Sequence, residues 1–314
     1  MYHNYDMETI LQHIRTAPVK NLILDTDTYN EIDDQYAVTY AMLAEDIRLL
    51  ALTAAPFCNN RAASAGEGME KSYQEMIKVR DMIDPSGKRN IPCYRGSRDY
   101  MKNIITPQPS EAAENIIRLV HEADDIVYIA VIGCYTNVAS ALLMDPSIMD
   151  KAVILMIGAN KFEREDANEF NLMQDRAAAR VLFECGVPLV VLPAFDCTER
   201  LYTTTGEMLY YLWDKAGAIG NYLCQILMED EHIPEDENGF CHSRQRTIWD
   251  IGAIAFLRKS ENICGIRIVP ARTIDARGYW RDLNDGRNML YAFCFHRNEV
   301  FSDFFTVIRK AELK

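Results

Sequence analysis

The chain has little positive charge for its length. Its 314 residues carry 33 lysines and arginines against 46 aspartates and glutamates, which gives a formal net charge of −13 at pH 7. A protein that binds a phosphate backbone needs a basic face, so this balance argues against nucleic acid as a partner. An acidic chain suits a bound cation or an uncharged small substrate instead.

The sequence also lacks the patterns that mark a disulfide framework, a zinc site or a membrane segment. Its nine cysteines are scattered, with no Cys-x-x-Cys pair and no Cys/His cluster, which indicates reduced thiols rather than disulfides or structural zinc. No run of about 18 apolar residues occurs, and Met1 to Asp6 have neither a basic start nor an apolar stretch. We therefore expect a cytoplasmic protein that does not bind membranes.

No linker rich in Pro, Gly or Ser divides the chain, and no internal repeat is visible, so we predict a single domain over residues 1–314. Short β-branched runs alternate with helical patterns, which predicts an α/β fold with an open, mainly parallel sheet and helices on both faces. The expected strands are 21–24, 48–54, 126–132, 152–157 and 188–192, and the expected helices are 33–44, 68–83, 136–144, 175–184 and 299–311.

Two further segments carry specific expectations. Residues 273–277 and 289–295 flank the turn sequence Asn284-Asp285-Gly286, which predicts a C-terminal antiparallel hairpin. Residues 229–239 are too charged to pack in a core and interrupt two helical patterns. This acidic segment is either a solvated loop or a mobile lid over an active site, and the sequence leaves both interpretations open.

A cluster of acids follows the first expected strand, in the segment Leu24-Asp25-Thr26-Asp27-Thr28-Tyr29-Asn30-Glu31-Ile32-Asp33-Asp34. Ligands of open α/β sheets bind beyond the carboxyl ends of the strands. Five carboxylates within ten residues repel one another unless a cation or solvent screens them. Oxygen donors at this density suit calcium or magnesium, and calcium tolerates the irregular geometry of a loop.

A simpler interpretation is that Asp33 and Asp34 only begin the next helix, where negative charge is favourable. It leaves Asp25 and Asp27 at the strand end unexplained, so we predict a metal or catalytic role for the cluster.

The segment resembles the signature of the inosine–uridine-preferring nucleoside hydrolase family, which has Asp-x-Asp, a short turn, Asp-Asp and an apolar helix. The turn here, Thr28 to Ile32, is two residues longer. The resemblance extends over about residues 20 to 310. It implies a calcium-dependent enzyme that releases free base and ribose from ribonucleosides or related N-ribosides, and a homodimer or homotetramer.

Later segments match the family in order and spacing, and the resemblance implies a role for each. The turn 130–139 matches one in which a backbone carbonyl, here that of Ile132, binds the metal. The element 169–171 matches the family's Glu-Phe-Asn, whose Glu169 and Asn171 bind sugar hydroxyls. Asp250 matches the last carboxylate ligand. Asn59 and Asn60 lie where the family places an asparagine that helps hold the ligand.

The implied mechanism follows from these matches. Asp27 binds the metal and takes a proton from the attacking water, while Asp34, Asp250 and the Ile132 carbonyl complete the metal site. Asp33 accepts a bond from a ribose hydroxyl. The metal holds the ribose diol and activates water, and the sugar contacts orient the substrate for a transition state that resembles an oxocarbenium ion.

Trp249 is the most consequential departure from the family, because members that prefer purine and uridine ribosides often have a His immediately before the last Asp. Indole is not a general acid at neutral pH, but its face stacks on a nucleobase. Base preference is therefore open. We expect p-nitrophenyl riboside, whose leaving group departs as a stable anion, to be cleaved faster than inosine.

Two other functional classes fit part of the pattern. Asp25-Thr26-Asp27-Thr28 resembles the Asp-x-Asp-x-Thr motif of haloacid dehalogenase-type phosphatases, in which Asp25 would be the nucleophile. A nucleoside- or sugar-binding protein without activity is the other alternative, because a fold does not dictate catalysis. The phosphatase alternative leaves Asp33-Asp34 unexplained and makes Glu169-Phe170-Asn171 a coincidence. The binding-protein alternative stays open, because Trp249 removes one expected catalytic group.

Overall fold

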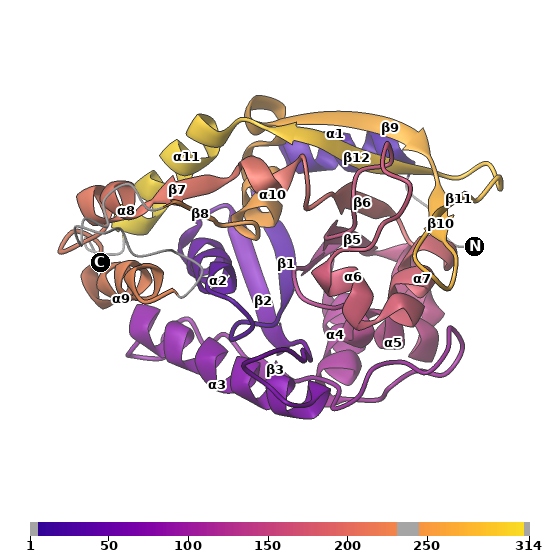
Figure 1. Cartoon of the computed structure of the whole chain (residues 1–314), viewed down its shortest axis with the longest axis horizontal. Coiled ribbons are helices and arrows are strands. Elements are labelled where there is room, and N and C mark those ends of the chain that lie inside the picture. Colours follow the sequence, from indigo (N-terminus) through magenta and orange to yellow (C-terminus); the bar gives the residue numbers. More distant parts are fainter. Residues whose placement is uncertain (1–5, 231–244, 311–314) are drawn as a thin grey trace.

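The computed structural model describes residues 6–230 and 245–310, and their arrangement is that of a twisted sheet between helices (Figure 1). The strands are β1 Lys20–Thr26, β2 Ile47–Ala54, β3 Cys93–Arg95, β4 Val127–Val131, β5 Ala152–Ile157, β6 Leu189–Leu192, β7 Tyr202–Thr204, β8 Gln245–Thr247, β9 Cys264–Pro270, β10 Arg272–Ile274, β11 Trp280–Asp282 and β12 Asn288–Phe295. The α-helices are α1 Met7–Thr16, α2 Asp33–Leu43, α3 Ala65–Ile83, α4 Glu111–Glu122, α5 Thr136–Met144, α6 Phe170–Gln174, α7 Arg176–Glu184, α8 Thr205–Tyr211, α9 Gly217–Met228, α10 Ile251–Ile263 and α11 Arg297–Arg309.

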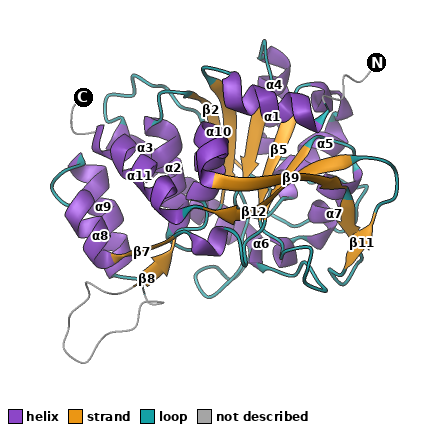
Figure 2. Cartoon of the chain, turned by 90° about the horizontal axis from the view of Figure 1, so that it is seen from above, coloured by secondary structure: helices purple, strands orange, loops and turns teal. Residues whose placement is uncertain are grey.

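The main sheet has eight strands in the order β3-β2-β1-β4-β5-β6-β12-β9. Every neighbouring pair is parallel except β12 and β9, which are antiparallel at one edge. The predicted α/β class with a mainly parallel sheet is confirmed. Two small antiparallel pairs, β7 with β8 and β10 with β11, lie outside this sheet (Figure 2).

Helices cover both faces of the sheet because its central strands are apolar at successive positions. All five residues of β4 are buried, as expected for a parallel strand with no face in water. Alternate residues belong to opposite layers. Tyr128 is in the core cluster that includes residues of α2, α10 and α11, and Ile129 is in the cluster that includes residues of α4, α5 and α7. Figure 1 shows α2 and α3 on one side of the sheet and α4, α5 and α7 on the other.

A C-terminal antiparallel hairpin is present, but its pairing differs in detail from the expectation. β12 pairs with β9, residues 264–270, whereas β10 pairs with β11. The turn residues Asn284 and Gly286 do take positive φ, 53° and 81°. β9 has seven residues, close to the eight of β12, whereas β10 has three. The segment between β9 and β12 therefore forms its own short hairpin.

The order of the strands places a functional site. From β1 the chain turns to β2 on one side, and after β3 it crosses to β4 on the other side of β1. α2, which follows β1, and α5, which follows β4, lie on opposite faces. The loops after β1 and β4 therefore separate, and a crevice opens at this topological switch point.

Within the described part of the chain, no helix is both long and apolar enough to cross a membrane. Most of the acidic segment 229–239 lies outside the described residues, so its two interpretations stay predictions.

Candidate active site

A pocket of about 140 Å³ lies at the switch point, beyond the carboxyl ends of β1, β4, β5 and β6. Its walls come from six separate segments of the chain, which the sheet brings together. The lining residues are Asp27, Asn30, Glu31, Asp33, Asp34, Ile132, Ile157, Glu169, Phe170, Asn171, Ala194, Phe195, Trp249 and Asp250. Eight of the ten residues predicted from the sequence are in this set.

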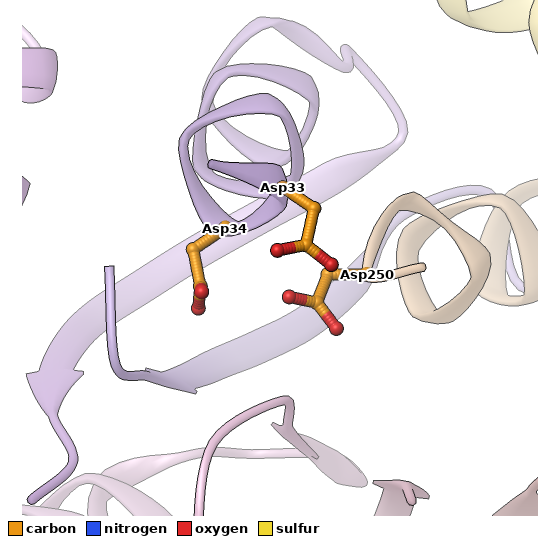
Figure 3. Close-up of side chains that lie close together, drawn as sticks. All are labelled: Asp33, Asp34 and Asp250. Carbon is orange, nitrogen blue, oxygen red and sulfur yellow. The ribbon is translucent and has the colours of Figure 1, made fainter. Parts of the chain in front are cut away.

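Three carboxylates converge in the pocket. Asp33 and Asp34 begin α2, and Asp250 immediately precedes α10 (Figure 3). One oxygen of each lies within 4.8 Å of the others, although Asp250 is more than 200 residues away in the sequence. All three side chains are buried, with at most 5% of each residue exposed. Such a cluster of hard oxygen donors has the chemistry of a divalent cation site.

These acids do not serve as ordinary helix caps. The residues before α3 and α4, Ser64 and Ser110, accept a hydrogen bond from a backbone N–H of the first turn, and Asp175 does so for α7. α2 begins after Ile32 with no side-chain cap, and Asp250 makes no capping bond to α10. The carboxylates of Asp33, Asp34 and Asp250 instead lie close together (Figure 3), and all three residues line the pocket. The simpler interpretation of Asp33 and Asp34 as helix starters therefore does not account for their geometry.

Asp27 completes the acidic floor. It is 1% exposed, and its Oδ2 has no hydrogen-bond partner among the described residues. A Cβ on Gly133 would come within 2.9 Å of the Asp27 carboxyl carbon. Glycine at 133 thus lets the loop after β4 approach this carboxylate closely.

Burial and repulsion between carboxylates raise the pKa values of the four aspartates of the pocket, Asp27, Asp33, Asp34 and Asp250. Burial raises the pKa of Asp33 to about 7, and the charge of Glu31 adds to the effect while Arg246 opposes it. Burial raises the pKa values of Asp27, Asp34 and Asp250 well above the ordinary range, and the neighbouring aspartates raise them further. Like charges in a low-dielectric pocket favour protonation unless a cation replaces the protons.

Hydrogen bonds hold the remaining polar groups of the floor in place. The Thr26 hydroxyl donates to Asp34 at 2.5 Å, and the Asn171 side-chain amide donates to the Ile132 carbonyl at 2.7 Å. Glu169 caps α6 by accepting from the backbone N–H groups of Asn171 and Leu172, and it also accepts from that of Ala159. The element 169–171 is therefore tied to the loops after β4 and β5.

Aromatic side chains line the outer part of the pocket. Trp249 and Phe195 are in edge-to-face contact, with ring centroids 5.5 Å apart and an interplanar angle of 74°. Both rings, and that of Phe170, are partly exposed, in contrast to the buried floor. None of the histidines within 6–230 and 245–310 lines the pocket.

Asn59 and Asn60 are the two predicted residues outside the pocket wall. The Asn59 amide donates to Asn30 Oδ1 at 2.7 Å, so it reaches the pocket through Asn30. Asn60 lines a separate cavity with Tyr29 and Arg61. Their predicted contact with a ligand stays a prediction.

Several lining residues were not singled out from the sequence. Asn30 and Glu31 belong to the turn after β1. The unusual length of this turn was visible in the sequence and could have drawn attention to both residues. Phe195 follows β6, and nothing in the sequence marks it as a pocket residue, because apolar residues are common after strands. Arg246 does not line the pocket. Its side chain is 13% exposed and pairs with Glu31 and, at 2.8 Å, with Asp230.

Asp25 does not have the position of a nucleophile. It is fully buried, and its Oδ1 accepts from Thr53 at 2.6 Å and from Asn137 at 2.9 Å. Burial raises its pKa to about 7. It links the ends of β1, β2 and α5 and does not line the pocket, which removes the basis for the phosphatase alternative.

Comparisons with known proteins show the family of this chain. The model of the family described as inosine-uridine preferring nucleoside hydrolase matches residues 22–281. The chain is 23% identical to a pyrimidine-specific ribonucleoside hydrolase RihA of Enterobacter sp. (strain 638), over 66% of this chain and 68% of that protein. It is 26% identical to the probable uridine nucleosidase 2 of Oryza sativa subsp. japonica, over 68% of each chain.

Solved structures show the same fold. A purine-preferring ribonucleoside hydrolase from Gardnerella vaginalis superposes with a TM-score of 0.73 at 20% identity, covering 94% of this chain and 100% of the other. An inosine-guanosine nucleoside hydrolase superposes with a TM-score of 0.70 at 17% identity, covering 93% and 98%. Because the family model matches most of its length, this chain belongs to the inosine-uridine preferring nucleoside hydrolase family and is an N-glycosyl hydrolase of ribonucleosides.

Proposed function

We propose that the pocket binds one calcium ion through Asp27, Asp34, Asp250 and the carbonyl of Ile132, and that ribonucleosides are hydrolysed there. The convergence of buried carboxylates from α2 and α10 is the observation that carries the proposal. The residues fit the ion in two ways: all the donors are oxygens, as calcium prefers, and Asp27 Oδ2 is buried without a partner among the described residues. Buried acids in such a cluster need a counter-charge.

The ion, when bound, supplies positive charge that holds the ribose diol and lowers the pKa of water. Asp27 then accepts a proton from the attacking water, as the residue of the floor whose second oxygen has no other described partner. Because Asp27 is buried, bulk water does not compete with the attacking water for its carboxylate oxygen. Proton transfer to a positioned base contributes about 10²- to 10⁴-fold to a rate.

The other residues orient the sugar. Asp33 accepts a bond from a ribose hydroxyl, and Glu169 and Asn171 bind the remaining hydroxyls. Asn171 is positioned in advance because its amide donates to the Ile132 carbonyl and its backbone N–H donates to Glu169. A side chain that is already ordered loses little entropy when substrate binds, so its binding energy goes into orientation.

The base lies against the aromatic rings. Trp249 and Phe195 offer partly exposed faces for stacking, while the buried carboxylates below suit the polar sugar. This division of polarity orients a nucleoside with ribose inward and base outward. Stacking tolerates any flat ring, so these faces alone do not select one nucleobase.

We further propose that the enzyme works in the cytoplasm as a dimer or tetramer. All eight cysteines in the described residues are free, as expected of a reducing compartment. Tyr202, Tyr210 and Trp213 are exposed by 41%, 68% and 40%, which supports a contact surface near α8. Light scattering would give two or four times the chain mass of 35.9 kDa, and a monomer at micromolar concentration would contradict the assembly.

One experiment tests both the metal and the reaction. It compares three proteins: the unaltered enzyme, the Asp250→Asn variant, and the Asp81→Asn variant as a surface control. Asp81 is 57% exposed at its side chain. Elemental analysis should find about one calcium per chain in the unaltered protein and the control, and much less in Asp250→Asn. Free-base release from a panel of nucleosides should follow the calcium content and stop after chelation.

Zinc in place of calcium, or full turnover after exhaustive chelation, would overturn the metal proposal. Saturable nucleoside binding without base release would show a binding protein on this scaffold. Hydrolysis of p-nitrophenyl phosphate but not of nucleosides would support the phosphatase alternative instead.

A further inference from the structure

One arginine outside the pocket lining connects three segments of the chain around the acidic cluster. Arg246 lies on β8, four residues before Asp250. Its Nη2 pairs with the Glu31 carboxylate, and its Nε lies 2.8 Å from Oδ2 of Asp230. The side chain of Asp230 is fully buried. A single guanidinium therefore joins the turn after β1, the end of α9 and the strand that leads to α10.

The turn that carries Glu31 depends on side-chain contacts for its position. α2, which follows the turn, begins without a side-chain cap. Asn59 donates to Asn30 Oδ1 at 2.7 Å, and Arg61 donates to the Glu31 carbonyl at 3.2 Å. Both of these donors follow β2, whereas Arg246 precedes α10. Of the three contacts, the ion pair with Arg246 is therefore the one that joins the turn to the segment leading to α10.

That segment is itself held by backbone pairing. β8 pairs with β7, and Arg246 lies opposite Thr203 in this pair. The Ile248 N–H donates to the Leu201 carbonyl at 2.8 Å, and Asp250 follows two residues later. The start of α10 therefore has a defined position, to which Arg246 ties the turn.

Stability alone is a weak reason for such a buried ion pair. Moving charged groups out of water costs free energy, and the attraction between them often does no more than offset this cost. A guanidinium does, however, fix directions, because its N–H groups lie in one rigid plane. By contacting two carboxylates from different segments, it sets how those segments lie relative to each other. A lysine, with one compact ammonium group, lacks this geometry.

We propose that Arg246 is a positioning residue for the acidic cluster: it holds the turn 28–32 against the segment that leads to α10, and thereby sets the separation between the acids of α2 and Asp250. The inference rests on the proposed function, because it concerns the same metal site. Oxygens of Asp33, Asp34 and Asp250 lie within 4.8 Å of one another, and a shared cation requires such a close approach.

A positional role and a purely electrostatic role of Arg246 predict opposite results. Through its positive charge alone, removal of Arg246 would strengthen the binding of a cation to the nearby acids. Through the loss of position, removal weakens that binding. Calorimetric titration of the metal-free protein with calcium measures the dissociation constant, and we expect Arg246→Met to raise it by about 10-fold. Arg246→Lys keeps the charge but should also raise the dissociation constant.

Controls separate position from folding. Arg246→Met takes a cation away from the buried Asp230, so this variant should unfold more easily. The double variant Arg246→Met/Asp230→Asn removes both charges of that pair, and it should regain thermal stability but not calcium affinity. Arg180→Met loses an ion pair with Glu184 within α7, outside the pocket lining, and should bind calcium as tightly as the unaltered protein. A merely structural role would lower the melting temperature and leave the dissociation constant of the folded protein unchanged.

The contact with Glu31 is tested by a double-mutant cycle. If Arg246 acts through Glu31, Arg246→Met should change the calcium dissociation constant at least about threefold less in a Glu31→Ala background. Equal changes in the two backgrounds would overturn the inference. Calcium binding by Arg246→Met that is unchanged or tighter would also overturn it.

Failure of the proposed function looks different. If the unaltered protein takes up no calcium and releases no base from any nucleoside, the proposed function fails, and the role of Arg246 fails with it. If the unaltered protein binds calcium and hydrolyses nucleosides while Arg246→Met and Arg246→Lys match it in both, only the role of Arg246 is wrong.

Discussion

Two buried acidic sites in this molecule have opposite electrostatics. Asp303 of α11 is 8% exposed and accepts bonds from Arg258 and Lys259, each at 2.8 Å, and from the Tyr40 hydroxyl. Burial opposes ionisation, but these partners outweigh it and lower the pKa of Asp303 to about 2. In the pocket, burial and neighbouring acids raise the pKa values of Asp34 and Asp250 well above the ordinary range.

The difference shows which buried charge serves structure and which serves function. A buried carboxylate is stable only with a compensating charge or hydrogen bonds. Asp303 obtains its partners from the chain itself, so folding completes the site. Among the described residues, no lysine, arginine or histidine lines the pocket of these aspartates, so without a bound cation their raised pKa values favour protonation. The predictions below test this contrast, from the largest expected effect to the smallest.

Asp27→Asn should produce the largest loss. In the proposed mechanism Asp27 is both a metal ligand and the proton acceptor, so we expect kcat/KM for uridine or p-nitrophenyl riboside to fall by about 10³-fold or more. Circular dichroism should show an unchanged fold. If the variant keeps a turnover rate within tenfold of that of the unaltered enzyme, a residue other than Asp27 accepts the proton.

Asparagine at the two acidic sites should change stability in opposite directions. Asp303→Asn leaves Arg258 with a weaker buried partner, and we expect a loss of about 3 kcal/mol in unfolding free energy with activity retained. Asp250→Asn removes one of several repelling charges, so the metal-free protein should become more stable by about 1 kcal/mol. Urea denaturation in the presence of a chelator measures the unfolding free energy of both variants. A loss of stability in both would show that the pocket acids are already compensated within the chain.

The pH dependence of stability should differ between the sites. Asp33 has a pKa raised from 3.8 to about 7, so its contribution to the metal-free fold is present below pH 4 and is lost as pH rises through 7. We expect the melting temperature in chelator to fall by about 5 °C between pH 5 and pH 8, and calcium to restore it at pH 8.

Asp303 provides the internal contrast. Its pKa is lowered to about 2, so its contribution is present above pH 4 and disappears as pH falls through 2. In Asp303→Asn, the loss of stability on acidification below pH 4 should be smaller than in the unaltered protein.

For the pocket, a melting temperature of the metal-free protein that stays constant from pH 5 to pH 8 would contradict the raised pKa of Asp33.

Trp249→Ala should affect activity less than Asp27→Asn does. Stacking contributes mainly to ground-state binding, so KM for uridine should rise by about 10-fold while kcat changes less than about threefold. Trp213→Ala is the matched control, since Trp213 does not line the pocket. A decrease in kcat larger than the increase in KM would give Trp249 a role in the transition state.

Local patterns were sufficient to predict most of the main sheet. β4, β5 and β6 are short apolar runs, and α5 occupies the predicted residues 136–144. The patterns did not identify β9 as the partner of β12, because pairing between strands depends on contacts that lie far apart in the sequence. Short elements outside the sheet, such as β7 and β8, were also missed, since three residues carry too little periodicity to be recognised.

The sequence by itself determined the strand–helix order, the acidic cluster after the first strand and the substitution of Trp249 for an expected histidine. The first two features follow from composition and spacing, which the chain carries in every conformation, and the third follows from the resemblance to the family. Only the tertiary structure decided that Asp250 joins Asp33 and Asp34, that Asp25 faces Thr53, and that Phe195 packs against Trp249. The crossing of the chain from β3 to β4 brings these distant segments to one switch point, and no local pattern encodes that crossing.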